Sequence, residues 1–421
     1  MRKAIGVYYL YTGLTTLFFM MVFSSNMVYQ VETAGLNPLQ LVLVGTVLEL
    51  SVLLFEVPTG IVADLYTRKG LIIIGSILVG CGFMIEGNFP SFLPILIAQI
   101  VWGFGYTFTS GALIAWITDE IGQENVANVL LRGSQLEEIS GIVGTLAGVI
   151  LASIRLNIPI LLAGGGFVVL GFLLLNLMPE NGFKSVPAQE RHTFTQMAVT
   201  FRDGMKLLNA RKALIYLMVF AFFLGLYSEG FDRLWTPHLL TNLSFPNYLG
   251  VKPVVWFGLM TTAGGLLTLG AVEFVRRKME QSGSQILILV LILSSGSLSI
   301  FLLIFALTAN IPLAVATWLV IYVLRRAVSP VYTIWFNERL SSNLRATMLS
   351  FSGQVDALGQ VLGGPPVGWL GKTRGVSAGL LASALLVIPA ALVLVPILKR
   401  RNLSLLEGDG GQSGLPENPC S

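Results

Sequence analysis

The sequence predicts an all-α membrane protein with twelve transmembrane helices arranged as two six-helix pseudo-repeats. Of its 421 residues, 54% are hydrophobic and only 11% are charged, whereas soluble domains carry about 25% charged residues. The apolar stretches run unbroken for about 20 residues, enough to cross a bilayer as a helix. They lack the strict alternation of a membrane β-barrel. The two halves of the chain also repeat each other.

Apolar runs bounded by charged residues, Gly, Pro and Asn place the spans along the chain. The expected spans cover residues 5–31, 40–63, 70–88, 92–118, 133–154, 158–177, 212–239, 253–275, 285–308, 312–336, 346–370 and 376–398. The first run follows Arg2 and Lys3 without a small-residue cleavage site. We therefore expect it to be a retained span and not a removed signal peptide.

The longest polar stretch lies between the sixth and seventh spans and divides the chain. We expect an N-terminal six-helix bundle at 1–178, a cytoplasmic linker at 179–211, a C-terminal six-helix bundle at 212–401 and a disordered cytoplasmic tail at 402–421. Residues 193–208 of the linker alternate apolar and charged side chains, as an interfacial helix does. The tail is rich in Gly, Ser, Pro and acids.

The loops predict the orientation, because cytoplasmic loops carry an excess of Lys and Arg. With the N-terminus inside, nearly all basic loop residues fall on the cytoplasmic side, and the outer side holds only Arg155, Lys252, Lys372 and Arg374. Both termini are expected in the cytoplasm. The short loops favour a bacterial inner membrane, in contact with membrane lipid.

The two halves match at a constant offset of 219 residues. Trp116 at the end of the fourth span matches Trp335 at the end of the tenth. In the fifth and eleventh spans, Gln135, Glu137 and Gly144 match Gln354, Asp356 and Gly363. Several matches at one register indicate a duplicated six-helix unit, the way many secondary transporters are built.

The loop between the second and third spans carries a motif. Gly60, Asp64, Arg68 and Lys69 fit the pattern G-x-x-x-D-[RK]-x-G-[RK]-[RK], while Leu65 and Thr67 depart from it. Together with the twelve repeated spans, this loop resembles the major facilitator superfamily. The resemblance covers about 400 residues as architecture. It implies a secondary transporter in which Gly60, Asp64, Arg68 and Lys69 form a conformational latch.

Residues 56–60, Glu-Val-Pro-Thr-Gly, resemble the bacterial drug-efflux branches of that superfamily, which are proton antiporters associated with multidrug resistance. The fourth span reads Gln99-Ile-Val-Trp102-Gly103-Phe-Gly105, similar to the pattern R-x-x-Q-G-x-G of those branches. Gln99 occupies the position of the arginine linked there to proton coupling.

Ionisable residues within the spans are the best candidates for proton coupling or substrate binding, since a charge in the bilayer needs a partner or a wet cavity. Such residues are Glu49, Glu229, Asp232, Arg233, Arg325, Arg326 and Asp356. Arg325 and Arg326 point about 100° apart on a helix, so at most one faces a cavity squarely. Fixed ion pairs between helices are the alternative interpretation of these charges.

In the superfamily, the resemblance implies, spans 1, 4, 7 and 10 line a central cavity. Polar and aromatic residues at this depth suit an amphipathic solute. The candidate cavity residues are Asn26, Gln99, Tyr106, Tyr227 and Tyr322.

Several function classes are not supported. The sequence has no nucleotide-binding G-x-x-x-x-G-K-[ST] loop, and its two histidines suggest no metal site. We expect no enzyme activity, no cofactor, no metal and no nucleic-acid partner, and a monomer.

Three hypotheses stay open. The first is proton-coupled export of a small amphipathic molecule or drug by alternating access. The second is a uniporter or symporter of an anionic metabolite bound by Arg325 and Arg326. The third is a membrane receptor or scaffold that transports nothing.

Overall fold

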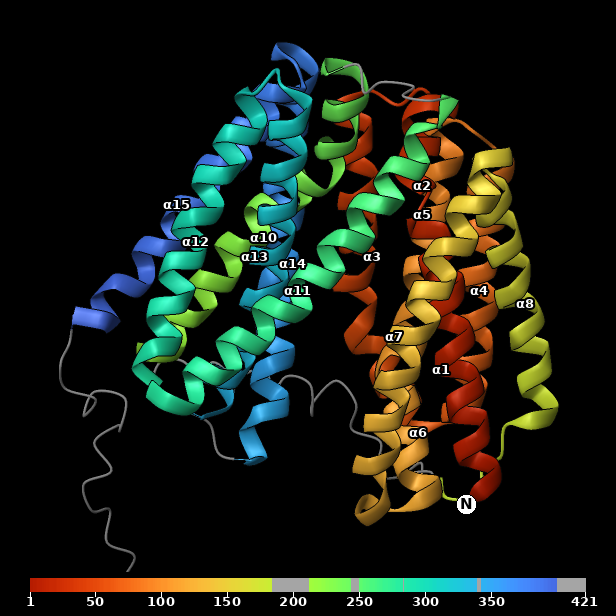
Figure 1. The fold of residues 1–421 in the computed structure, drawn as a ribbon. Coiled ribbons are helices and arrows are strands. Elements are labelled where there is room, and N and C mark those ends of the chain that lie inside the picture. Colours follow the sequence, from red (N-terminus) through yellow and green to blue (C-terminus); the bar gives the residue numbers. More distant parts are fainter. Residues whose placement is uncertain (184–211, 244–249, 283, 339–341, 400–421) are drawn as a thin grey trace, which may run out of the picture.

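The computed structural model describes residues 1–183, 212–243, 250–282, 284–338 and 342–399, and the regular elements in these ranges are helices (Figure 1). The expected interfacial helix at 193–208 and the tail at 402–421 lie outside the described residues. Of the linker, only residues 179–183 are described.

The helices of the N-terminal half follow the six expected spans, with some spans in two or three pieces. In chain order they are α1 (Arg2–Phe23), α2 (Asn26–Val28), η1 (Tyr29–Thr33), α3 (Pro38–Leu65), α4 (Arg68–Asn88), α5 (Phe92–Ser110), α6 (Ala112–Ile121), α7 (Gln123–Ile154) and α8 (Ile158–Leu177). The first span ends in a π-helical turn, η1, and the fourth span divides into α5 and α6 at Gly111.

The C-terminal half has the same succession. Its helices are α10 (Lys212–Pro237), η3 (His238–Asn242), α11 (Pro253–Ser282), α12 (Ser284–Leu307), α13 (Ile311–Glu338), α14 (Ser342–Arg374) and α15 (Val376–Lys399). Another π-helical turn, η3, ends the first span of this half, as η1 does in the other. Eleven helical segments within the described residues are long and apolar enough to cross a membrane. The remaining expected span, α14, is more polar, and it packs against α3, α10 and α15.

Local sequence explains where individual helices begin. Asn37 caps α3: its side chain accepts a hydrogen bond from the Gln40 N–H at 3.1 Å, and the Gln40 side chain accepts one from the Asn37 N–H at 3.0 Å. Pro38 occupies the first helical position, where no N–H is needed. Thr67 caps α4 by accepting from the Gly70 N–H at 3.0 Å.

The duplication is visible in the helix contacts. Within the N-terminal half, α1 packs on α7 and α4 packs on α8; in the C-terminal half, α10 packs on α14 and α12 on α15. The matched glycines have the same role. A Cβ at Gly144 would collide with the Leu17 carbonyl of α1, and a Cβ at Gly363 would collide with the Leu226 carbonyl of α10. Each half therefore needs glycine where its fifth helix crosses its first.

The two halves meet mainly along α3 with α14, and also through α7 with α11. The start of α3 lies against the end of α14. A Cβ at Gly368 would lie 2.9 Å from the Val42 Cβ, and a Cβ at Gly371 would lie 3.1 Å from the Pro38 Cβ. The end of α7 meets the start of α11, where a Cβ at Gly258 would lie 2.5 Å from a Val149 methyl group. These contacts are at the face of the bundle opposite the start of α1.

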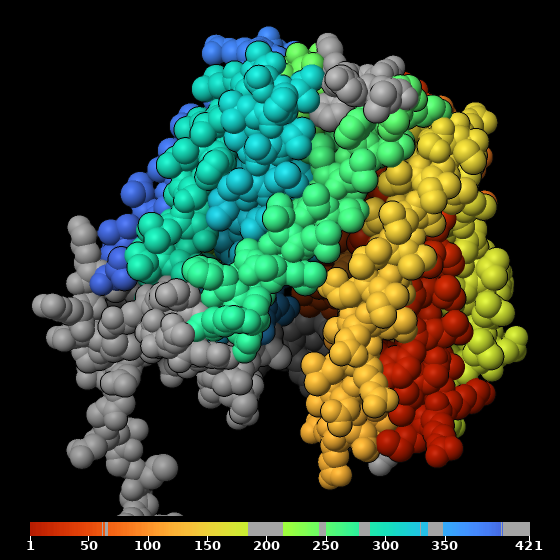
Figure 2. Space-filling model, in the orientation of Figure 1, coloured from red at the N-terminus to blue at the C-terminus, as the bar shows by residue number. Residues whose placement is uncertain are grey.

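At the other face, where α1 begins (the Met1 face), each half has an apolar core of its own. One core joins Ala4, Ile72 and Trp116 within the N-terminal half, and another joins Leu214, Leu287 and Trp335 within the C-terminal half. By contrast, Val28, Val42 and Ala152 of the N-terminal half join a core of the C-terminal half near the opposite face. Figure 2 shows α11 and α7 touching at their upper ends and diverging below, with a hollow between them. The structure is therefore open toward the Met1 face.

Candidate functional site

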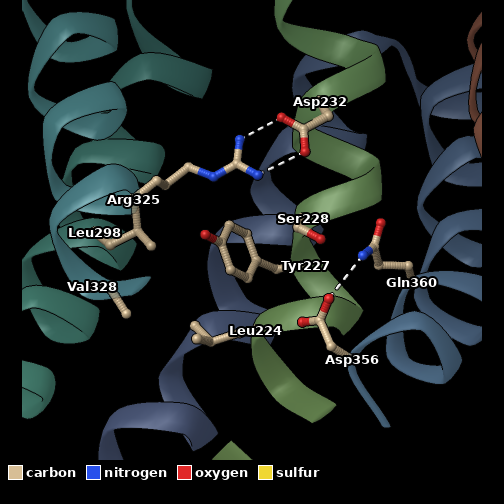
Figure 3. A pocket seen from close by; sticks show the side chains of 9 residues that line it. All are labelled: Leu224, Tyr227, Ser228, Asp232, Leu298, Arg325, Val328, Asp356 and Gln360. Carbon is tan, nitrogen blue, oxygen red and sulfur yellow. Dashed lines mark hydrogen bonds and ion pairs between the residues drawn. The ribbon is translucent and has the colours of Figure 1, made fainter. Parts of the chain in front are cut away.

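A small cavity lies inside the C-terminal half, between α10, α12, α13 and α14 (Figure 3). Its volume is about 220 Å³, and its lining residues are Leu224, Tyr227, Ser228, Asp232, Leu298, Arg325, Val328, Asp356 and Gln360. Three of the ionisable residues singled out from the sequence, Asp232, Arg325 and Asp356, therefore surround one space. So does Tyr227, a candidate cavity residue.

Arg325 of α13 and Asp232 of α10 form a two-point ion pair at the edge of this cavity. One guanidinium nitrogen, Nη2, donates to Asp232 Oδ2 at 2.6 Å, and Nη1 donates to Oδ1. The guanidinium also lies 5.2 Å from the Phe231 ring centre and 5.7 Å from that of Tyr227. This planar pairing suits arginine and not lysine. The pair ties the seventh span to the tenth.

Asp356 lies across the same cavity on α14. Its Oδ2 accepts a hydrogen bond from the Gln360 amide at 2.9 Å, one helical turn away. Among the described residues no cation is within ion-pair distance of Asp356. It is the acidic group of the cavity with only a neutral partner.

A larger cavity of about 600 Å³ adjoins the same ion pair on α10, α11 and α13. Its lining residues are Phe231, Asp232, Trp235, Thr261, Trp318, Tyr322, Arg325, Arg326 and Pro330. The ring of Trp318 lies 5.1 Å from each of the rings of Trp235 and Tyr322. Arg326 is exposed, and its guanidinium lies 5.1 Å from the Tyr322 ring centre. This cavity combines an aromatic wall with charged groups.

The other charges of α10 form a separate buried pair. Arg233 Nε donates to Glu229 Oε1 at 2.9 Å, one turn apart, and Arg233 Nη1 approaches the Met27 sulfur at 3.8 Å. A Cβ at Gly45 of α3 would collide with the Glu229 carboxylate. This pair therefore lies where the two halves meet. The half-buried Glu49 of α3 interacts through its charge with both Glu229 and Arg233.

The three candidate cavity residues of the N-terminal half have different surroundings. Tyr106 of α5 is 40% exposed, and its ring centre lies 6.4 Å from that of Phe19. Asn26 is half-buried at the start of α2. Gln99 is 3% exposed and lines neither of the two cavities described above.

Gln99 belongs to a buried polar cluster around Glu86, a residue that the sequence analysis did not single out. Gln30 Nε2 donates to Glu86 Oε1 at 2.7 Å, and Gln99 Nε2 donates to Oε2 at 3.1 Å. Trp102 Nε1 donates to Gln99 Oε1 at 2.9 Å, and the Tyr29 hydroxyl donates to the Glu86 carbonyl at 2.7 Å. The signal in the sequence was a lone acid in the otherwise uncharged stretch from residue 70 to 118.

The loop between α3 and α4 makes its described contacts within the N-terminal half. Arg68 forms an ion pair with Asp119 at the end of α6 and lies 5.7 Å from the Phe183 ring centre. Glu180, just after α8, accepts hydrogen bonds from the Lys69 N–H at 2.9 Å and from the Thr67 hydroxyl at 2.8 Å. Lys69 Nζ donates to the Leu175 carbonyl.

Of the other two motif residues, Asp64 and Gly60, the structure describes the surroundings of Gly60 only. The side chain of Asp64 lies outside the described residues. Gly60 is exposed, and no atom of the described part of the chain lies within 4 Å of the position its Cβ would take. In this state Gly60 is therefore not at a close helix contact. Asp119 and Glu180, which hold the basic residues of the loop, come from segments distant in the sequence.

Comparison with known proteins decides the family. The sequence profile described as Major Facilitator Superfamily matches residues 9–364. The chain belongs to the major facilitator superfamily. It is therefore a multi-span membrane transporter and not an enzyme, and the predicted fold of apolar helices is confirmed.

Relatives in the superfamily agree over nearly the full length. An MFS-type transporter of Bacillus subtilis (strain 168), YxaM, described as uncharacterized, is 24% identical over 409 residues, 93% of this chain and 94% of that protein. The solved nucleoside transporter NupG has a TM-score of 0.73 at 13% identity, covering 94% of this chain and 100% of NupG. A bacterial homologue of the human lysosomal transporter Spinster, solved in an inward-facing and unoccupied conformation, has a TM-score of 0.72 at 16% identity, covering 94% and 97%. At these identities the solved structures establish the fold alone.

Proposed function

We propose that this member of the major facilitator superfamily exports a small amphipathic molecule, in the manner of a drug-efflux protein, by proton-coupled alternating access. The observation that carries the proposal is the Asp232–Arg325 pair, which borders both cavities of the C-terminal half. Aromatic rings on one side of the pair suit the apolar part of a solute. Charged groups on the other side suit its polar part.

Asp356 is proposed as the group that exchanges the proton. It faces the cavity beside the Asp232–Arg325 pair, and its hydrogen-bond partner, Gln360, is neutral. A change in its charge alters the field at the pair, because two unit charges interact strongly at short range in a poorly screened site. Proton binding at Asp356 and solute binding at the pair are then linked.

Orientation follows from the positive loops. We place both termini in the cytoplasm of a bacterial cell and the protein in the inner membrane as a monomer, with the two six-helix bundles rocking about the cavity. The Met1 face is then cytoplasmic, and the described conformation is open to the inside. In the outward-open state the Met1 ends of the two halves close, and we assign Gly60, Asp64, Arg68 and Lys69 to holding them together.

Transport in proteoliposomes tests the proposal. The purified protein is reconstituted with a pH-sensitive dye inside, and lipophilic cations, neutral drugs and organic anions are added in turn. We expect a cationic or neutral compound to move protons in the wild type and not in Asp356→Asn or Asp232→Asn. Glu124→Gln, which removes an exposed carboxylate from the start of α7, is the matched control and should behave as wild type. Compound movement without proton movement would reject the coupling, and no movement of any compound would favour the receptor hypothesis.

A second candidate, transport of an anionic metabolite, rests on Arg326. Among the described residues no carboxylate is within ion-pair distance of Arg326, whereas Arg325 is neutralised by Asp232. One positive charge therefore faces the larger cavity without a balancing acid. If only anions move in the same assay, this candidate replaces the first.

A further inference from the structure

Two acidic side chains are buried among the described residues, and they differ in their partners. Glu229 is 3% exposed and pairs with Arg233. Glu86 is 1% exposed, and both of its carboxyl oxygens accept hydrogen bonds from neutral glutamine amides. Burying an ionised carboxylate without a cation is costly, and binding a proton removes that cost. Glu86 is therefore the buried acid, within the described part of the chain, whose charge nothing nearby neutralises.

The surroundings of Glu86 carry few charges. The helices packed on α4 include α5 and α8, which contain no charged residue along their lengths. From η1, the Tyr29 hydroxyl bonds to the Glu86 backbone, and the side chain of Gln30 to its carboxyl group. Arg233 of α10 acts on Glu86 only through its field, and Arg155 acts in the same way on Tyr29. The proton state of Glu86 is therefore set mainly by its burial and then by the two amides.

The two glutamine amides are held differently. The Trp102 indole can only donate, so its bond to Gln99 Oε1 turns the Gln99 NH₂ group toward Glu86 and keeps it there. Gln30 has no such third partner. Its Oε1 is buried and has no hydrogen-bond partner among the residues that the structure describes. The Gln30 amide can therefore rotate by half a turn without breaking any other hydrogen bond of its own.

We propose that Glu86 is a proton-binding site, with the Gln30 amide as its switch. When Glu86 is ionised, the Gln30 NH₂ group donates to Oε1, as in the structure. When Oε1 takes up a proton, Gln30 turns and its Oε1 accepts the new O–H bond. In both states Gln99 donates to Oε2. One proton from water is bound or released, and the unpartnered oxygen of Gln30 gains a partner.

The position of the site relates it to the transport cycle. Glu86 lies near the end of α4, at the face where the two halves are in contact. Gln30 follows Met27 by less than one turn, and Met27 touches Arg233 of α10. Opening of this face separates α2 from α10 and admits water toward Gln30 and Glu86. We therefore assign proton uptake to the state open opposite the Met1 face, in a half of the protein that holds neither of the two cavities.

The Glu86→Gln variant imitates the protonated state. Its new NH₂ group donates to the turned Gln30, and its Oε1 accepts from Gln99, so we expect the variant to fold. The test is infrared spectroscopy of the full-length protein in lipid, titrated with acid. We expect one component of the protonated-carboxyl C=O band to rise with acid in the wild type and in Asp356→Asn and to be lost in Glu86→Gln. Glu32→Gln, an exposed acid at the same face, keeps the band and is the matched control. Gln30→Leu should move the midpoint of the titration by at least tenfold in proton concentration.

A band that survives unchanged in Glu86→Gln would overturn the proposal, as would a Gln30→Leu midpoint equal to that of the wild type. The role in transport rests on the proposed proton coupling and has its own readout. In proteoliposomes, Glu86→Gln should lose pH-driven accumulation and keep solute exchange at equal pH on both sides. If the wild type moves solute without protons, the proposed coupling is rejected while the infrared result still decides the site. If Glu86→Gln accumulates solute as wild type does, the transport role is overturned.

Discussion

Arg325 on α13 and Asp232 on α10 are joined by two parallel hydrogen bonds, and both residues border both cavities of the C-terminal half. Their side chains are 25% and 43% exposed, so the pair is partly solvated. The pair can therefore hold two helices of one half together and also bind a solute. The same guanidinium that ties two spans together is accessible from the cavities.

Breaking this pair should reduce stability moderately. Asp232→Asn leaves Arg325 without a counter-charge, and for a partly exposed pair we expect a loss of about 1–2 kcal/mol, less than the 3–5 kcal/mol of a fully buried one. Thermal unfolding in detergent measures the loss. The charge-swapped double variant, Asp232→Arg with Arg325→Asp, should recover part of it. A swapped protein no more stable than the single variants would contradict a specific pair.

Arg326→Gln should distinguish the two candidate substrates. The substitution removes the positive charge that lies over Tyr322 without a carboxylate partner. We expect binding of organic anions to weaken at least about tenfold, which corresponds to roughly 1.4 kcal/mol. Binding of lipophilic cations should be unchanged or stronger. Titration calorimetry with both compound classes measures this, and equal weakening of both would mean that Arg326 acts through the shape of the cavity.

Glu180→Gln should loosen the start of α4. The carboxylate accepts from the Lys69 N–H and from the Thr67 hydroxyl, so it lies at the positive end of the helix. Removing its charge should cost about 0.3–1 kcal/mol. Hydrogen exchange of the first turn of α4 should become faster. Glu124→Gln, at the start of α7, is the control and should leave α4 exchange unchanged.

A disulfide between the halves should trap the described state. A Cβ at position 368 would lie 2.9 Å from the Val42 Cβ, and bridged cysteines need about 3.5–4.5 Å, so a small separation allows the bond. With Cys81 and Cys420 replaced by serine, the Val42→Cys and Gly368→Cys pair should abolish transport on oxidation and regain it on reduction. Val42→Cys with Gly353→Cys is the control, because no described atom, including those of Val42, lies within 4 Å of a Cβ at 353. Transport by the oxidised pair would mean that this face need not open.

The helices themselves could be predicted closely from the sequence. The expected span at 158–177 coincides with α8, and that at 70–88 differs from α4 by two residues at the start. Runs of apolar residues and the caps that end them are local properties, so the order of the residues is sufficient. The break at Gly111 within the fourth span was missed, because the apolar run continues across it.

The candidate site could be predicted only in part. Asp232, Arg325 and Asp356 were selected because a charge in a bilayer needs a partner, but the sequence left open which partner each one takes. Asp232 and Arg325 are 93 residues apart, and their pairing depends on how the fold places α10 and α13 around the cavities. Glu86 was missed for the opposite reason: its partners are uncharged, and they come from two other elements, η1 and α5.

By itself, then, the sequence determined the membrane class, the helical spans, the two-fold repeat and the family, all of which follow from composition, local periodicity and a motif. The tertiary structure alone decided which charges neutralise each other, where the cavities lie and which face is open. The physical reason is that helices are stabilised by hydrogen bonds between residues close in the chain. Cavities and ion pairs arise where helices distant in the chain meet.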